Sequence, residues 1–294
     1  MIKRLFHSRV LKHFLKDPLA IVGVLILFVM LIGAIFAPLI APQNPYNPRE
    51  LSLQDSLKPP LWMHGGESPF LLGADDQGRD ILSTILYGCR TSFMVGFSVV
   101  ILAGLLGVTI GLIAAFYGGV LDAITMRVAD TLFSFSTTLM AMLLLGIFKG
   151  GGIPLVILAI VIADWVRYAR TMRGSTLAVK QEDYVEAARA IGSHNVRIMF
   201  RHILPNAIPP ILVVAAVDFG AAVMLEATLS FLGVGVPINE PSLGMMIASG
   251  KNYIYAGMWW LTAFPGISLI AIVLGVNLLA DWLREEINPR LKRG

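Results

Sequence analysis

Charged residues are scarce in this sequence. Asp, Glu, Lys and Arg together make up 14% of the 294 residues, whereas hydrophobic residues make up 56%. Soluble domains carry about 25% charged residues. The few charges gather in short stretches, separated by long uncharged runs. This pattern excludes an ordinary soluble domain and predicts a chain that is solvated mostly by lipid.

Cysteine is nearly absent. The single Cys89 cannot form an intrachain disulfide, and we interpret it as a small residue near a helix start. The five histidines are His7, His13, His64, His194 and His202. None is spaced with carboxylates or with the cysteine as a metal site requires, so we predict no metal site.

The motifs of nucleotide binding and of common hydrolases are also missing. There is no G-x-x-x-x-G-K-[ST] loop, no G-x-S-x-G and no H-E-x-x-H. We therefore predict that this chain is not an enzyme and holds no cofactor of its own. The net charge of +4 does not indicate nucleic acid, because the basic residues lie at the ends of apolar runs.

Long apolar runs are what the sequence has in abundance. We expect an all-α integral membrane protein with six transmembrane helices, since about 20 apolar residues span a bilayer. The expected spans are 19–40, 92–117, 125–148, 153–168, 207–232 and 258–283. Asp17 is placed to cap the first, with Pro18 at its first helical position. This run is too long for a signal peptide and reads as a retained anchor.

The distribution of Lys and Arg predicts the orientation. Seventeen of the 23 lie in segments on the same side as the N-terminus, so both termini are expected to be cytoplasmic. Residues 1–18 and 284–294 are then inside, and 41–91 is an extracytoplasmic segment. We expect an amphipathic helix over 79–90 at the outer surface. Residues 92–283 form a five-helix core.

The inside loop, 171–205, carries the clearest local signals. Asp183 followed by Glu186 is typical of a capping box, which predicts a short helix that Gly192 ends. Ser193 is placed to cap a second short helix, and Pro205 marks where the fifth span begins. Such a polar, slim helix suits a groove on a partner protein.

The same loop resembles the EAA motif of binding-protein-dependent ABC import permeases. The matching residues are Glu186, Ala187, Ala188, Gly192, Leu204 and Pro205, and His202 stands at the usual Ile position. The resemblance implies a type I ABC importer permease fold. It also implies that this loop couples the pore to ATP-binding subunits, with Glu186 as polar anchor and Gly192 as the bend.

The single N-terminal span and the long loop after it resemble the C-type partner of a peptide permease pair. A stretch of that loop resembles the outer-loop signature of the dipeptide/oligopeptide/nickel subfamily. Its residues include Gly73, Asp75, Asp76, Gly78, Arg79 and Asp80. The resemblance implies a bacterial or archaeal inner membrane, a second homologous permease, two ATP-binding subunits that carry ATP and Mg, and an external solute-binding protein. It implies di- or oligopeptides as solute, with nickel or another small solute as the alternative.

Two carboxylates, Asp218 and Glu226, lie inside the fifth span, where buried charge is costly and often functional. They either line the transport pathway, meeting a peptide amine or a cation, or pair with neighbouring helices. As proton or cation sites they would suit an ion-coupled secondary transporter, a rival function. That rival has no need of the 171–205 loop and shows paired repeats that we do not find.

Two further carboxylates lie near the expected inner face of the membrane. Asp130 follows Arg127 by three residues, and Asp164 precedes Arg167 by three. Residues three apart are neighbours on a helix. We predict a local ion pair in each case.

Overall fold

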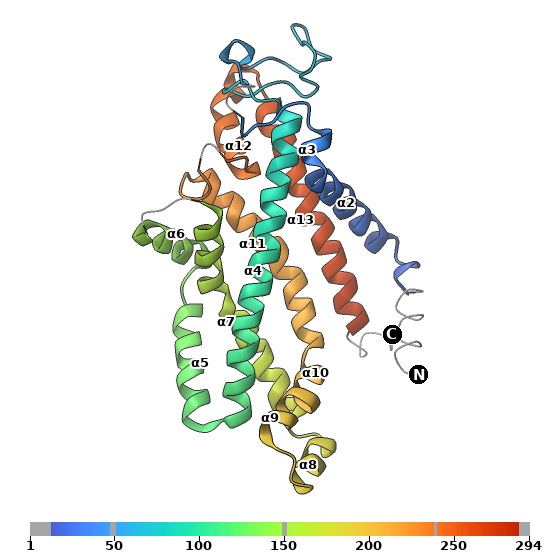
Figure 1. The fold of residues 1–294 in the computed structure, drawn as a ribbon, viewed down its shortest axis with the longest axis vertical. Helices are drawn as coiled ribbons and strands as arrows, with labels where there is room; N and C mark the ends of the chain where they lie inside the picture. The colour runs from blue at the N-terminus through green and yellow to red at the C-terminus, as the bar shows by residue number, and fades with distance from the viewer. Residues whose placement is uncertain (1–12, 48–50, 149–151, 238–239, 288–294) are drawn as a thin grey trace.

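The computed structural model describes residues 13–47, 51–148, 152–237 and 240–287. In these ranges the chain folds into an elongated bundle of helices without a named β-strand (Figure 1). The α-helices are α2 (Pro18–Ile35), α3 (Ala37–Ile40), α4 (Ile81–Tyr117), α5 (Gly119–Phe133), α6 (Thr137–Phe148), α7 (Ile153–Val179), α8 (Asp183–Ala190), α9 (Asn195–Ile198), α10 (Leu204–Ala207), α11 (Pro209–Phe231), α12 (Leu243–Gly250) and α13 (Trp260–Ile287). Two 3-10 turns, η1 (Leu53–Asp55) and η3 (Lys251–Ala256), and a π-helical turn, η2 (Met199–Ile203), complete the set.

Four described helices, α2, α4, α11 and α13, are long and apolar enough to cross a membrane. The pair α5 and α6 passes the same test together, but the two halves meet at an angle of 91°. The predicted span 125–148 is therefore not one continuous helix, because the chain turns sharply at residues 134–136. Length and composition support four or five spans, so the predicted count of six is not confirmed.

The predicted fourth span belongs to α7, which continues to Val179. The helix is 27 residues long and carries Asp164, Arg167 and Arg170 within its first 18 residues. These charges remove it from the set of apolar spans. They are tolerated because α7 packs along α4 and against α5, α6 and α11.

The close packing of α4 on α7 depends on two glycines. A Cβ on Gly107 would clash with the Trp165 carbonyl oxygen, and one on Gly111 would clash with the Ala169 carbonyl oxygen. Small residues four apart let two helix backbones approach in this way. The G-x-x-x-G spacing of the sequence thus marks a contact inside this chain.

The amphipathic surface helix predicted over 79–90 is wrong. Asp80 caps α4 by accepting a hydrogen bond from the Ser83 backbone N–H at 2.7 Å, and the helix then runs unbroken for 37 residues. Ile81, Ile85 and Cys89 are buried in a core that α4 shares with α11, α12 and α13. The boundary placed at residue 91 is therefore not a boundary of the fold.

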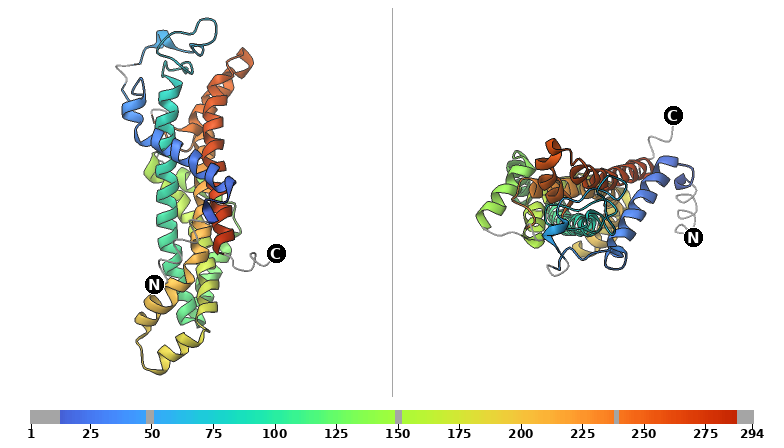
Figure 2. Two further views of the ribbon diagram at one scale, coloured as in Figure 1. Left: turned by 90° about the vertical axis from the view of Figure 1, so that its right-hand side faces the viewer. Right: turned by 90° about the horizontal axis from the view of Figure 1, so that it is seen from above.

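The first span begins as predicted. The Asp17 side chain accepts hydrogen bonds from the backbone N–H groups of Leu19 and Ala20, and Pro18 opens the helix. α2 packs on α13, where Gly23 lies against the backbone of Gly275. Seen from above, α5 and α6 lie on the side of the bundle opposite α2 (Figure 2).

The two ends of the bundle differ. One end carries the segment 51–80 and α12, and we call these two parts together the cap. The other end carries α8 and α9 (Figure 1). α4, α7 and α13 run from the cap towards the α8 end, and α2 and α11 run the opposite way. The start of α2 and the end of α13 thus point in the direction of the α8 end.

Candidate functional site

The predicted coupling loop is built around α8. Its N-cap is Glu182, not Asp183, and no side-chain hydrogen bond caps the helix, so the predicted capping box is wrong. Gly192 ends the helix as predicted, with a φ of 77° that favours glycine. The Gly192 N–H donates to the Arg189 carbonyl at 2.9 Å and the Ser193 N–H donates to the Ala188 carbonyl at 3.0 Å. These two bonds form a Schellman motif.

One face of this loop is turned outward. Val185 and Ala188 of α8 are buried against the bundle, while Glu186 and Ala187 are exposed. Large apolar side chains are exposed around them: Tyr184, Ile191, Val196 and Phe200. An acidic residue set among exposed apolar side chains is a surface suited to another protein.

The chain then returns to the bundle along an almost continuous helix. His194, not Ser193, is the N-cap of α9, so the predicted serine cap is wrong. The π-helical turn η2 and α10 lead directly into α11. Leu204 and Pro205 open α10, where a missing proline N–H is tolerated.

The loop is tied to the last turn of α4. The Lys180 ammonium donates hydrogen bonds to the backbone oxygens of Phe116 at 2.7 Å and Ala115 at 3.4 Å. The Arg189 guanidinium lies 5.8 Å from the centre of the Phe116 ring, within cation–π distance. Sequence reasoning missed this connection, because nothing near Lys180 in the chain indicates its acceptors.

Two arginines of α7 hold α5. Arg173 forms two hydrogen bonds with the Asp122 carboxylate, both at 2.7 Å. Arg170 pairs with Asp130, so the predicted local pair between Asp130 and Arg127 is wrong. The three-residue spacing of the arginines on α7 is visible in the sequence. Nothing in the sequence indicates their partners, which lie 40 and 51 residues away.

A third arginine of α7 joins two buried carboxylates. Arg167 pairs with Asp218 of α11 and lies 3.5 Å from Asp164, one turn earlier on α7. The predicted pair of Asp164 with Arg167 is thus confirmed. The side chains of Asp164 and Asp218 are 8% and 1% exposed, and that of Arg167 is 40% exposed. A hollow of about 320 Å³ between α6, α7 and α11 is lined by Asp164 and Arg167.

Glu226 lies elsewhere on α11 and is fully buried. Its carboxylate accepts hydrogen bonds from the hydroxyls of Ser230 at 2.9 Å, Ser242 at 2.8 Å and Ser92 at 3.4 Å. These partners come from α11, from the residue before α12 and from α4. The structure therefore does not bring Asp218 and Glu226 together, and Glu226 joins three elements below the cap.

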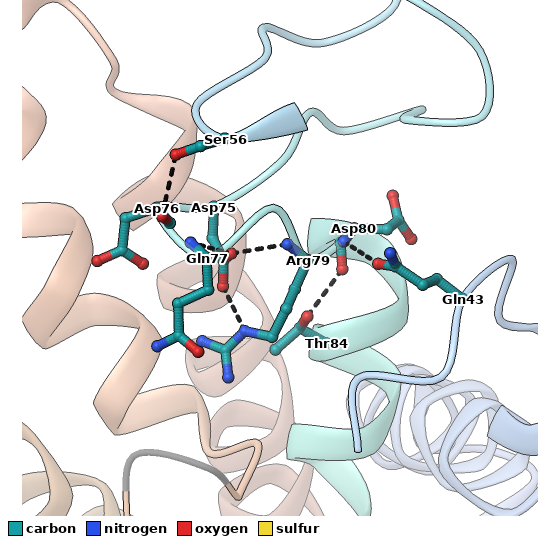
Figure 3. A network of polar contacts seen from close by, with 8 residues as sticks. All are labelled: Gln43, Ser56, Asp75, Asp76, Gln77, Arg79, Asp80 and Thr84. Atoms are coloured by element: carbon teal, nitrogen blue, oxygen red, sulfur yellow. Dashed lines mark hydrogen bonds and ion pairs between the residues drawn. The ribbon is translucent and has the colours of Figure 1, made fainter. Parts of the chain in front are cut away.

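The predicted outer-loop signature forms a tight turn in the cap (Figure 3). Asp75 accepts hydrogen bonds from the backbone N–H groups of Gln77 and Arg79, both at 2.9 Å, and from Arg79 Nε at 2.6 Å. Gly73 and Gly78 both have positive φ. A side chain at Gly78 would also collide with the Ser52 carbonyl.

The turn is fixed to the start of α4. The Asp80 N–H donates to Gln43 Oε1 at 2.7 Å (Figure 3). The Asp80 carboxylate accepts a hydrogen bond from the Ser83 hydroxyl at 2.6 Å. Burial raises the pKa of Asp76, and the nearby charge of Asp75 adds to this effect. Burial likewise raises the pKa of Asp80. The charged residues of the signature therefore build the cap more than they present charge to solvent.

The fold is that of a multi-pass membrane protein with charge pairs between its helices and a two-helix loop at one end. Residues 107–293 match the family described as binding-protein-dependent transport system inner membrane component, and residues 6–60 match the N-terminal TM domain of oligopeptide transport permease C. The chain belongs to this family of transport permeases. Within the described residues, no group of three or more His, Cys, Asp and Glu side chains is placed to hold a metal ion.

Relatives cover nearly the whole chain. The di/tripeptide transport system permease protein DppC of Pseudomonas aeruginosa is 36% identical over 93% of this chain and 88% of its own length. The dipeptide transport system permease protein DppC of Escherichia coli is 39% identical over 96% of this chain and 92% of its own length. A solved structure of the MetNI methionine ABC transporter in an inward-facing conformation is similar with a TM-score of 0.57. It is 16% identical and covers 70% of this chain and 96% of that chain, which shows a shared fold.

Proposed function

We propose that this chain is a pore-forming permease subunit of an ATP-driven, binding-protein-dependent importer for di- or oligopeptides. The chain itself is a membrane component and not an enzyme. The observation that carries the proposal is the exposed α8, with its Glu-Ala-Ala sequence and the Schellman turn at Gly192. Peptide as the solute is supported by the relatives, which are named as dipeptide and di/tripeptide permeases.

In this proposal the two ends of the bundle meet different partners. Two separate ATP-binding subunits, which hold ATP and Mg, grip α8 of this chain and the matching helix of a second, homologous permease. The solute-binding protein docks on the cap. The α8 end and both termini are then cytoplasmic, in accord with the excess of Lys and Arg there. Large apolar side chains exposed along α2 and α4 contact lipid or the second permease.

Movement of α8 reaches the bundle by two connections. One is the three-residue link to α7, and the other is the contact of Lys180 and Arg189 with the end of α4. α7 in turn holds α5 and α11 through its three arginines. A switch of the pore needs contacts that differ in energy between its two states. Ion pairs between helices are suited to this, since small displacements break them.

The two carboxylates of α11 have different roles in this proposal. Asp218 belongs to the transport pathway through its pairing with Arg167, which lines the hollow beside α6. Glu226 does not touch solute and holds α12 on the bundle through its serine partners. An ion-coupled secondary transporter would need no partner at α8.

The test replaces residues of α8 that are exposed or that shape its end. Glu186→Lys and Gly192→Asp are expected to abolish binding-protein-dependent dipeptide uptake while the protein remains in the membrane. Asp281→Lys is a matched control, because this exposed carboxylate lies on α13, outside the 171–205 loop. Wild-type uptake by the two α8 variants, or purification of the chain without ATP-binding subunits, contradicts the coupling role.

A further inference from the structure

We propose that the hollow between α6, α7 and α11 binds the positively charged amino terminus of a peptide in transit, with Asp164 as the carboxylate that receives it. The inference rests on the proposed import of peptides. It adds a binding site in the permease to the one that the solute-binding protein supplies.

The hollow has the size of a small ligand site. Its volume is about 320 Å³, and an adjoining hollow of about 180 Å³ shares Thr137, Asp164 and Arg167 with it. Ligand pockets have volumes of roughly 300–1,000 Å³, mostly apolar, with a few polar groups that orient the ligand. Ile160, Leu225 and Met224 supply the apolar part here.

The charge around the hollow favours a cation. The Asp164 and Asp218 carboxylates lie against one guanidinium, that of Arg167. The two carboxyl groups share a single guanidinium, so this cluster has more acceptor oxygens than cationic donors. An ammonium group would supply further donors, whereas a carboxylate would add a third acidic group beside the same arginine.

Asp164 is the carboxylate that lines the hollow. Asp218 is 1% exposed, is held by Arg167 Nη1 and does not line the hollow. Asp164 lines both hollows, and its 3.5 Å contact with Arg167 Nη2 is longer than a normal N–H···O hydrogen bond. Its oxygens can therefore accept hydrogen bonds from a ligand.

Threonine hydroxyls supply the remaining acceptors of an ammonium site. Thr137, Thr138 and Thr228 line the same hollow as Asp164. The Thr228 hydroxyl donates its proton to the Met224 carbonyl at 2.8 Å, which leaves its oxygen lone pairs to accept. An ammonium has three N–H donors, which one carboxylate and two hydroxyls can satisfy.

The test measures binding to the complete permease–ATPase complex in lipid nanodiscs, without the solute-binding protein. The ligands are radiolabelled dialanine and N-acetyl-dialanine, which differ in the charge of the amino terminus. The wild type is expected to bind dialanine roughly tenfold more tightly than N-acetyl-dialanine. This is about the affinity ratio that one charge-assisted hydrogen bond provides. Asp164→Asn is expected to bind both peptides equally, and Asp164→Glu to keep the preference. Asp281→Asn, an exposed carboxylate of α13, is the matched control and keeps it too.

Three outcomes overturn the inference: equal binding of the two peptides by the wild type, an unchanged preference in Asp164→Asn, or displacement of dialanine by an equal concentration of sodium ions. If Asp164→Asn fails to assemble with its partners, the double variant Thr138→Val, Thr228→Val takes its place. This variant must weaken the binding of dialanine and leave the binding of N-acetyl-dialanine unchanged. Binding-protein-dependent dipeptide uptake by the wild type is measured in parallel. If the wild type shows no such uptake, the proposed function is overturned as well. If uptake is present, only the proposed binding site is overturned.

Discussion

Arg167 of α7 donates a hydrogen bond to Asp218 of α11, 51 residues further along the chain. The two side chains join the helix that leads to α8 with the helix that returns from it. A buried carboxylate of this kind is stable only with its partner, because the membrane interior offers little else to balance its charge.

Loss of this pair is expected to be costly. Arg167→Met leaves Asp218 and Asp164 without their shared partner and should destabilise the chain by about 3 kcal/mol, the low end of the range for buried pairs, because Arg167 is 40% exposed. The double variant Arg167→Met, Asp218→Asn removes both members of the closer pair and should recover part of that loss, because Asp164 still lacks its partner. Thermal unfolding in nanodiscs measures both. A double variant less stable than Arg167→Met contradicts the pairing.

Lys180 is expected to matter for coupling more than for folding. Its bonds to the backbone of Phe116 and Ala115 join the α8 loop to α4. Lys180→Met should therefore lower dipeptide uptake at least several-fold while the ATPase subunits still co-purify and hydrolyse ATP. Lys180→Arg, which keeps donors at this position, should retain more uptake. Equal uptake by Lys180→Met and the wild type would rule out this link.

Glu226 is expected to be a stability residue. Glu226→Ala leaves the hydroxyls of Ser92, Ser230 and Ser242 without their shared acceptor, at a cost of about 1–3 kcal/mol for each buried donor left unpaired. Glu226→Gln keeps an acceptor oxygen and should lose less. Membrane abundance and thermal unfolding compare the two. A stable Glu226→Ala with impaired uptake would instead place Glu226 on the pathway.

The cap is expected to weaken as the pH rises. Burial and Asp75 raise the pKa of Asp76 above its ordinary value, so the folded cap holds this proton more tightly than the unfolded chain does. Protons then favour the folded state, and stability falls as the pH rises from about 4 through the raised pKa. Hydrogen exchange of residues 52–80, corrected for intrinsic rates, measures this. Asp76→Asn cannot titrate and should remove that contribution, and an unchanged slope in this variant contradicts it.

Local rules predicted the features that depend on neighbours in sequence. The Asp17 cap, the bend at Gly192 and the close approach at Gly107 all follow from short-range geometry, and the structure has each of them. The length of apolar runs likewise indicated α4, α11 and α13. The family resemblance rested on spaced motifs and is confirmed by the match over residues 107–293.

The errors have a common physical cause. A prediction from sequence places a boundary at a charge or a polar stretch. In the folded chain, partners from distant helices pair with these polar groups. Residues 81–90 continue into the following span and are buried against α12 and α13 instead of lying at the surface. Asp130 pairs with Arg170 instead of Arg127. The 91° bend between α5 and α6 has no proline or glycine at 134–136 to announce it.

The 37 residues of α4 are many more than a membrane span needs. At 1.5 Å per residue the helix is about 55 Å long, against a hydrocarbon layer of about 30 Å. Tilting within the usual range of roughly 0–40° cannot absorb the difference. The length of α4 is therefore set by its peptide backbone and does not depend on the thickness of the lipid layer. Membranes of different acyl chain length will shift the tilt of α2, while the separation of the cap from the α8 end of the bundle stays constant.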